Sequence, residues 1–166
     1  ASETTTFTGS LATATDLDAS DTHAYSLVAN TTAVDNAAVT ITDANITVTA
    51  EGEYTLAGNF EALAVGETAT VTFEYTATDD SGAGNAQSVA KVVTLVVTGT
   101  NDAPVATVDA ATTAENAVLT IDVLANDTDV DNNHTFTLDS VTSAKGAVSI
   151  VNNALVFEAI AADFDH

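Results

Sequence analysis

Apolar and polar residues alternate along much of the chain, the pattern typical of β-strands. In 70–76 the apolar residues Val71, Phe73 and Tyr75 share one face, while threonine and glutamate occupy the other. The run 92–97 contains a second such row. Shorter strands are expected at 5–13, 23–29, 38–42, 45–49 and 53–57. No stretch shows the 3.6-residue period of an amphipathic helix, so the sequence predicts an all-β protein.

A diverged internal repeat organises the chain. Three groups of residues match in order: 15–18 with 23–27 matches 128–131 with 134–138, 38–41 matches 147–150, and 59–61 matches 163–165. Repetition at about 100 residues indicates a tandem array of whole domains. The second copy stops about 40 residues before the first does. We therefore expect either a segment of a longer chain or completion by strands of another molecule.

The only proline, Pro104, marks the boundary between the two copies. Proline fixes its own φ and favours an extended conformation at Ala103, which predicts a short, stiff link. The expected organisation is a complete β-sandwich over 1–99, a linker over 100–104 and a second, truncated sandwich over 105–166. About seven short strands per unit are typical of an immunoglobulin-like Greek-key sandwich.

Charge excludes several functions. The 166 residues contain 24 acidic residues and two lysines, for a net charge of −22. Nucleic acids and anionic membrane surfaces need basic groups, so neither is an expected partner. No apolar run approaches the roughly 20 residues of a membrane span, and no signal peptide is expected at the start of the chain. The absence of cysteine excludes disulfides and thiolate metal sites.

The aspartates are grouped. Nine of them lie in four loop or linker positions: Asp16, Asp18 and Asp21; Asp79 and Asp80; Asp102; and Asp127, Asp129 and Asp131. Alternate residues of an extended chain point the same way, so Asp-x-Asp aims two carboxylates at one point. Calcium, which takes 6–8 oxygen ligands, fits such a group best. Solvated Asp-rich turns are the alternative, and recurrence at matching repeat positions favours the metal. An EF-hand is excluded, because Asn132 and Leu138 stand where that loop needs glycine and glutamate.

Several motifs resemble one family of repeats. They are the linker run 98–105, the run 121–131, and the segments 9–18 and 63–68. Together they resemble VCBS-type, cadherin-like repeats of large RTX-type bacterial surface adhesins. The resemblance covers nearly the whole chain. It implies an extracellular array of sandwiches at the bacterial cell surface, exported by type I secretion and used in adhesion and biofilms, with calcium at the links between domains.

The resemblance also implies a ligand set for Ca²⁺. Asn101 and Asp102 resemble linker ligands, Asp127, Asp129 and Asp131 resemble ligands at the start of the following domain, and Asp79 and Asp80 resemble ligands at the base of a domain. Glu3 and Glu115 match an early acidic position. The expected junction site joins Glu3, Asp79, Asp80, Asn101, Asp102, Asp127 and Asp129. Asp16, Asp18 and Asp21 are expected to serve a preceding junction.

The expected function is that of a spacer, not an enzyme. His23 and His134 occupy equivalent strand starts, which indicates a structural role instead of a catalytic base. The expected partners are neighbouring repeats of the same chain, with adhesion to a cell surface or matrix left to other domains. Two alternatives remain open: a calcium-dependent module that binds a glycan, a cell surface or ice, and a homopolymer assembled by strand exchange.

Overall fold

The computed structural model describes residues 4–17, 20–82 and 86–163. The chain divides into two compact units, Ala1–Asn101 and Asp102–His166. The division falls inside the predicted linker.

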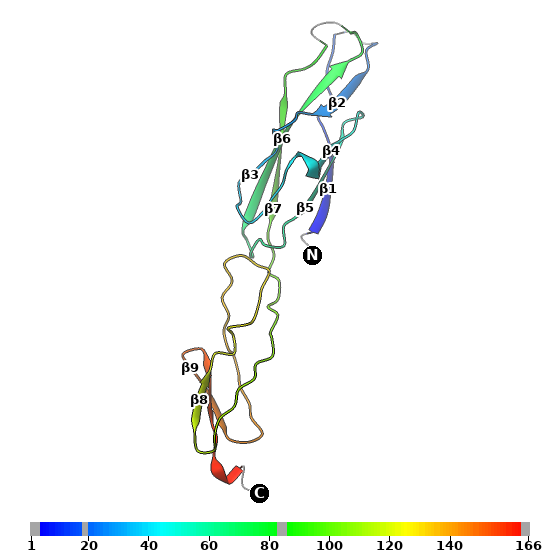
Figure 1. Ribbon diagram of the computed structural model, residues 1–166. Coiled ribbons are helices and arrows are strands. Elements are labelled where there is room, and N and C mark those ends of the chain that lie inside the picture. Colours follow the sequence, from blue (N-terminus) through cyan, green and yellow to red (C-terminus); the bar gives the residue numbers. More distant parts are fainter. Residues whose placement is uncertain (1–3, 18–19, 83–85, 164–166) are drawn as a thin grey trace. The chain divides into compact units, whose positions relative to one another are not determined.

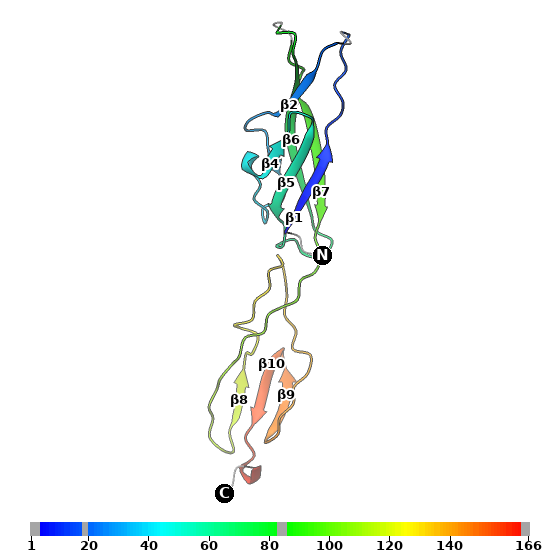
Figure 2. The same cartoon turned by 90° about the vertical axis from the view of Figure 1, so that its right-hand side faces the viewer.

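The first unit contains two β-sheets (Figures 1 and 2). One sheet has the order β1-β5-β4, with all pairs antiparallel. In the other, β6 lies in the centre, with β2 and β3 pairing along one edge and β7 along the other. The strands are β1 (Thr4–Ser10), β2 (His23–Leu27), β3 (Ala33–Val34), β4 (Ile46–Val48), β5 (Glu53–Asn59), β6 (Thr68–Asp79) and β7 (Lys91–Thr98).

The core of this unit lies between the two sheets. The alternation in β6 places Val71 and Phe73 inward, and both side chains are fully buried. Leu56 on β5 faces them from the other sheet and is also fully buried. The rings of Tyr54 and Phe73 meet edge to face with centroids 5.5 Å apart, which joins the two sheets directly. The prediction of an all-β, immunoglobulin-like sandwich is confirmed.

One predicted strand is wrong. Residues 38–42 form no strand, although Val39 and Ile41 are buried in the core. The strand at this point of the chain is instead β3, and the 3₁₀ helix Asp43–Asn45 follows the buried loop. Asn45 caps the start of that helix, because its side-chain oxygen accepts the backbone N–H of Thr42 at 2.9 Å. At 38–42 the alternation of apolar residues therefore indicates burial in the core, but it does not indicate pairing with another strand.

Gly99 fixes the end of β7. Its N–H donates to the carbonyl of Glu67 at 2.7 Å, and its carbonyl accepts the N–H of Gly66 at 3.1 Å. A Cβ here would stand 2.3 Å from the Leu63 carbonyl oxygen and 2.4 Å from that of Ala64. Only glycine fits so close to another stretch of backbone. The chain therefore leaves the first unit from a fixed point.

The second unit contains one three-stranded sheet, in the order β8-β10-β9, visible in Figure 2. The strands are β8 (Val118–Ile121), β9 (Ala147–Val151) and β10 (Ala154–Glu158), and a 3₁₀ helix, Ala161–Asp163, follows. This order repeats that of β1-β5-β4, so β9 corresponds to β4. The match of 147–150 to 38–41 is therefore wrong. Residues 164 and 165 of the third matched group lie outside the described residues. The buried residue directly after β10 is Ala159, as Phe60 is after β5.

The described part of the second unit has no second sheet and little core. Among its apolar residues only Ala159 is buried. Leu119, Leu155 and Phe157 are half-buried, whereas the matching sheet of the first unit holds the fully buried Leu56. Burial of apolar surface is the main stabilising term in folding. The first unit therefore carries most of the stability of this chain.

Truncation of Leu56 should measure that core. Leu56→Ala removes a fully buried side chain and leaves a cavity, so we expect the free energy of unfolding of the first unit to fall by about 2–5 kcal/mol. Urea unfolding followed by tyrosine fluorescence tests this, because all three tyrosines lie in this unit. Val92→Ala, at a side chain 60% exposed on β7, is the control and should change stability by less than about 0.5 kcal/mol. Equal effects of the two substitutions would contradict the proposed core.

Candidate metal centre

Three aspartates converge at one end of the first unit. Asp16, Asp21 and Asp79 each offer a carboxylate oxygen, and these oxygens lie within 4.8 Å of one another. Among the described residues this is the only such group of three acidic or metal-ligating side chains. Asp79 ends β6, while Asp16 and Asp21 lie in the loop between β1 and β2. Residues from two separate segments therefore build the group.

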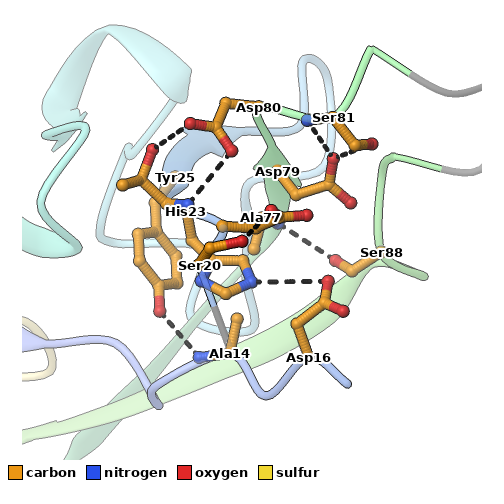
Figure 3. A network of polar contacts seen from close by, with 12 residues as sticks. Ala14, Asp16, Ser20, His23, Tyr25, Ala77, Asp79, Asp80, Ser81 and Ser88 are labelled. Atoms are coloured by element: carbon orange, nitrogen blue, oxygen red, sulfur yellow. Dashed lines mark hydrogen bonds and ion pairs between the residues drawn. The ribbon is translucent and has the colours of Figure 1, made fainter. Parts of the chain in front are cut away.

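Two backbone contacts hold the loop that carries Asp16. Leu11 is buried, and its N–H donates to the carbonyl of Gly52 at 2.7 Å. The N–H of Ala14 donates to the hydroxyl of Tyr25 at 2.7 Å, as Figure 3 shows. Asp16 follows two residues later and faces His23, whose Nε2 is 3.8 Å from its Oδ2. The position of Asp16 thus depends on the packing of the loop against β2.

The pairing of β2 with β6 brings Asp79 to the same place. His23 is the register partner of Asp79. The Oδ1 atom of Asp79 accepts hydrogen bonds from the backbone N–H of Ser81, at 2.9 Å, and from its hydroxyl. These bonds fix the orientation of the Asp79 carboxylate.

Asp80 has a different role from its neighbour. Its two carboxylate oxygens accept the backbone N–H of Thr22 at 3.1 Å and the Thr22 hydroxyl at 2.9 Å. The Thr22 hydroxyl, the Thr22 N–H and the nearby His23 lower the pKa of the Asp80 carboxyl. Asp80 therefore ties the end of β6 to the start of β2 and supports the cluster from outside.

The predicted grouping of Asp79 and Asp80 with the linker is wrong. In the β6–β7 register, Thr68 pairs with Thr98, next to the linker, while Asp79 lies at the other end of β6. At about 3.3 Å per residue, the eleven steps from Thr68 to Asp79 span roughly 36 Å. Asp79 thus joins Asp16 and Asp21, the residues expected to serve a different junction.

The second unit has a buried carboxylate in its own Asp-x-Asp run. Asp131 is 5% exposed, and its Oδ2 accepts the N–H of Asp102 at 2.9 Å. Its Oδ1 is buried without a hydrogen-bond partner in the described part of the chain. The N–H of Asp131 donates to Oδ1 of Asp129 at 2.9 Å, and its carbonyl lies 2.7 Å from Nδ1 of His134. A buried carboxylate oxygen without a hydrogen-bond partner is costly, which makes this atom a natural ligand for a cation.

The remaining predicted ligands are dispersed. Asp127 accepts the N–H of Thr107 at 2.8 Å, so it organises the chain just after the linker. Asn101 ends the first unit. Glu115 is exposed in the turn before β8, beside Asn116, whose N–H donates to the Ala159 carbonyl. Glu3 and Asp18 lie outside the described residues.

Sequence reasoning missed two supporting contacts. Thr22 carries no strong signal of its own, although it stands immediately before a predicted strand whose partner ends in Asp79-Asp80. Pairing 23–27 with 75–79 in antiparallel register would have placed both aspartates beside Asp21. The contact between Asp102 and Asp131 has no comparable signal, because it depends on how the linker backbone turns.

Removal of the Thr22 hydroxyl should change the titration of Asp80. In Thr22→Val we expect the pKa of Asp80 to rise towards its usual value, as measured by NMR titration of the carboxyl. Because the folded-state pKa is lowered, Asp80 stabilises the fold above pH about 4, and this contribution is lost as the pH falls through the lowered pKa. The variant should therefore lose less stability in that acid range. Asp35 serves as an internal control: its pKa is lowered by hydrogen bonds from Thr70, and it should not move. An unchanged Asp80 titration would contradict the role of Thr22.

Comparison with known proteins bears on the second unit. Residues 101–165 match a family model described as a bacterial Ig domain. Searches of curated proteins and of solved structures gave no match. In the described residues no helix has the length and apolar character needed to cross a membrane. The first unit has a sheet of the same strand order as the sheet of the second unit, within a two-sheet, immunoglobulin-like sandwich. The second unit is therefore similar to a bacterial Ig domain.

Proposed function

We propose that the two units are extender repeats of an extracellular bacterial surface protein, and that each unit binds Ca²⁺ through its Asp-x-Asp loop. One observation carries the proposal: Asp16, Asp21 and Asp79 come from separate segments and place their oxygens within 4.8 Å of one another. Two ligands of one calcium ion, each at about 2.3–2.6 Å, lie at most about 5 Å apart. The spacing of the cluster therefore fits a shared ion.

Electrostatics favour a cation at this cluster. Three carboxylates this close repel one another unless they are protonated or share a cation. The chain carries two lysines against 24 acidic residues, so few cationic side chains are available to neutralise the cluster. His23 contacts Asp16, with Nε2 3.8 Å from Oδ2. All three are oxygen donors, and cysteine is absent, which favours calcium over zinc or copper.

The second unit supports the same chemistry by a different observation. Asp129 corresponds to Asp16 in the repeat, and beside it the buried Oδ1 of Asp131 lacks a hydrogen-bond partner among the described residues. Asp102, in the middle of the linker, is already attached to Asp131 through its N–H. A cation held by Asp129 and Asp131 would strengthen this attachment and stiffen the chain where it enters the second unit.

The bound ions would give the repeats a mechanical role. In low calcium, repulsion within each cluster loosens the loops, and in high calcium the loops are fixed. A chain exported into calcium-rich surroundings would therefore stiffen outside the cell. The resemblance to VCBS-type adhesin repeats supports export by type I secretion and a place in adhesion and biofilms, with neighbouring repeats as the immediate partners.

An ice-binding or lectin-like surface finds less support. A flat threonine array on β6 would have to include Thr76, which is 7% exposed. Its hydroxyl is 3.2 Å from that of Ser26 and is also within reach of Gln87. Glu74 interrupts the same row. We propose no enzymatic role, because within the described residues neither His23 nor His134 forms a catalytic set with a serine nucleophile.

Calcium titration of the whole chain tests the proposal. We expect one ion for each unit, with a Kd of about 10⁻⁴ to 10⁻³ M, the range of extracellular calcium modules. Calcium at ten times Kd should raise the free energy of unfolding by roughly 1.4 kcal/mol. Asp16→Asn with Asp79→Asn should remove the ion of the first unit, and Asp131→Asn that of the second.

Glu51→Gln is the matched control, because it removes one exposed negative charge of the first unit that does not belong to the three-aspartate cluster. Its calcium stoichiometry should equal that of the wild type. Equal weakening by Glu51→Gln and by the cluster substitutions would show general attraction by the net charge of −22, and it would overturn the site.

Small-angle scattering tests the mechanical part. Addition of calcium to chelator-treated protein should narrow the distribution of distances between the two units and extend the maximum dimension. Asp131→Asn should abolish this change while leaving the first unit folded. A maximum dimension that does not respond to calcium in the wild type would refute the stiffening, even if calcium binds.

A further inference from the structure

Within its described residues, the second unit presents an open edge beside a half-buried apolar face. In the first unit, His23–Leu27 forms β2 because β6 pairs with it along its length. The matching residues 134–138 have the same alternation but form no strand. Among the described residues of the second unit there is no strand in the position of β6.

The segment 134–138 is nevertheless held in the equivalent place. In the first unit, the N–H of Tyr25 donates to the carbonyl of Ala50, in the turn between β4 and β5. In the second unit, Asn153, in the turn between β9 and β10, accepts the N–H of Leu138 at 2.8 Å and donates to the carbonyl of Phe136 at 2.9 Å. Both segments therefore lie against the corresponding turn of the three-stranded sheet.

These contacts decide which backbone groups face outward. Because Phe136 and Leu138 are turned to Asn153, the intervening Thr137 and the preceding Thr135 direct their N–H and C=O groups to the opposite edge. Both threonines are exposed, and no hydrogen bond to their backbone occurs within the described residues. In the first unit, the corresponding Ala24 and Ser26 lie opposite Thr78 and Thr76 of β6.

The apolar face beside this edge is also open. Leu119, Leu155 and Phe157, on β8 and β10, are only half-buried, and so is Phe136. In the first unit the same side of the sheet is covered by β6 and β7, and residues there such as Leu56 have no exposed surface.

We propose that the second unit is an acceptor for a β-hairpin of the β6–β7 type, in which one strand pairs antiparallel with 134–138 and both strands cover the face of β8-β10-β9. The first unit identifies the occupant, because it shows the same sheet and the same segment with their cover in place. The hairpin must carry apolar residues at alternate positions, as Val71, Phe73 and Tyr75 do in β6.

Charge adds a second requirement. β6 ends in Asp79 beside Asp16 and Asp21. An accepted hairpin that ended the same way would bring a carboxylate to the end of the second unit that holds Asp129 and Asp131. Acceptance of such a hairpin should therefore be favoured by calcium. This part rests on the proposed function, whereas strand pairing and burial do not.

The experiment appends a second copy of residues 61–98 to the full chain after His166, through a flexible linker. Hydrogen exchange of the Thr135 and Thr137 amides should slow at least about tenfold relative to the unextended chain. The control extension carries Val71→Asp and Phe73→Asp in the appended copy only, so the first unit is unchanged. It should leave exchange at both amides as it is in the unextended chain.

Three results would overturn the proposal. They are unchanged exchange with the intact extension, equal slowing with the control extension, and a concentration-dependent dimer of the unextended chain in which both amides are already protected. The last would assign the face to a second copy. Repeating the exchange measurement in chelator separates strand pairing from the calcium requirement. Slowing of exchange that persists without calcium supports pairing with the hairpin. If exchange is slowed with calcium and this slowing is lost only in chelator, the result concerns the calcium requirement alone.

Discussion

The burial of one face of β6 is the interaction on which the first unit depends. Val71 and Phe73 point from β6 to the sheet that holds Leu56, and all three are fully buried. The same strand pairs with β2 and β3 on one edge and with β7 on the other. Once its apolar face is buried, the register of β6 decides where its polar ends lie. Asp79 reaches Asp16 and Asp21 for this reason, and the beginning of β6 meets Thr98 beside the linker.

The second unit shows what remains when this strand is missing from the described residues. The three-stranded sheet keeps its order, and 134–138 keeps its place beside the turn. The apolar side chains, however, stay half-exposed, and the segment that matches β2 does not become a strand. β-strand formation at 23–27 is therefore a consequence of pairing, because nearly the same alternation at 134–138 does not suffice alone.

Much of the fold could be predicted from the sequence, because alternation and turn residues are local signals. The strands at 53–57, 70–76 and 92–97 were found for this reason. The strand expected at 38–42 failed because Val39 and Ile41 are buried in a loop, and burial alone does not reveal pairing. The aspartate clusters can be recognised in the sequence, but the grouping of Asp79 with Asp16 and Asp21 cannot. That grouping depends on which end of the twelve-residue strand β6 lies beside the loop between β1 and β2. The buried Asp131 was among the expected ligands, whereas its contact with the linker depends on the path of the backbone.

Gly99 also decides how tension would enter the first unit. Both of its backbone groups are bonded to the turn at Gly66 and Glu67, directly after β7. A pull on the chain beyond this point must first break those two bonds and then acts on β7. β7 is joined to β6 along its whole length, from Lys91 to Thr98. A force directed along the strand therefore loads these hydrogen bonds in shear, where they resist together, instead of opening them one at a time.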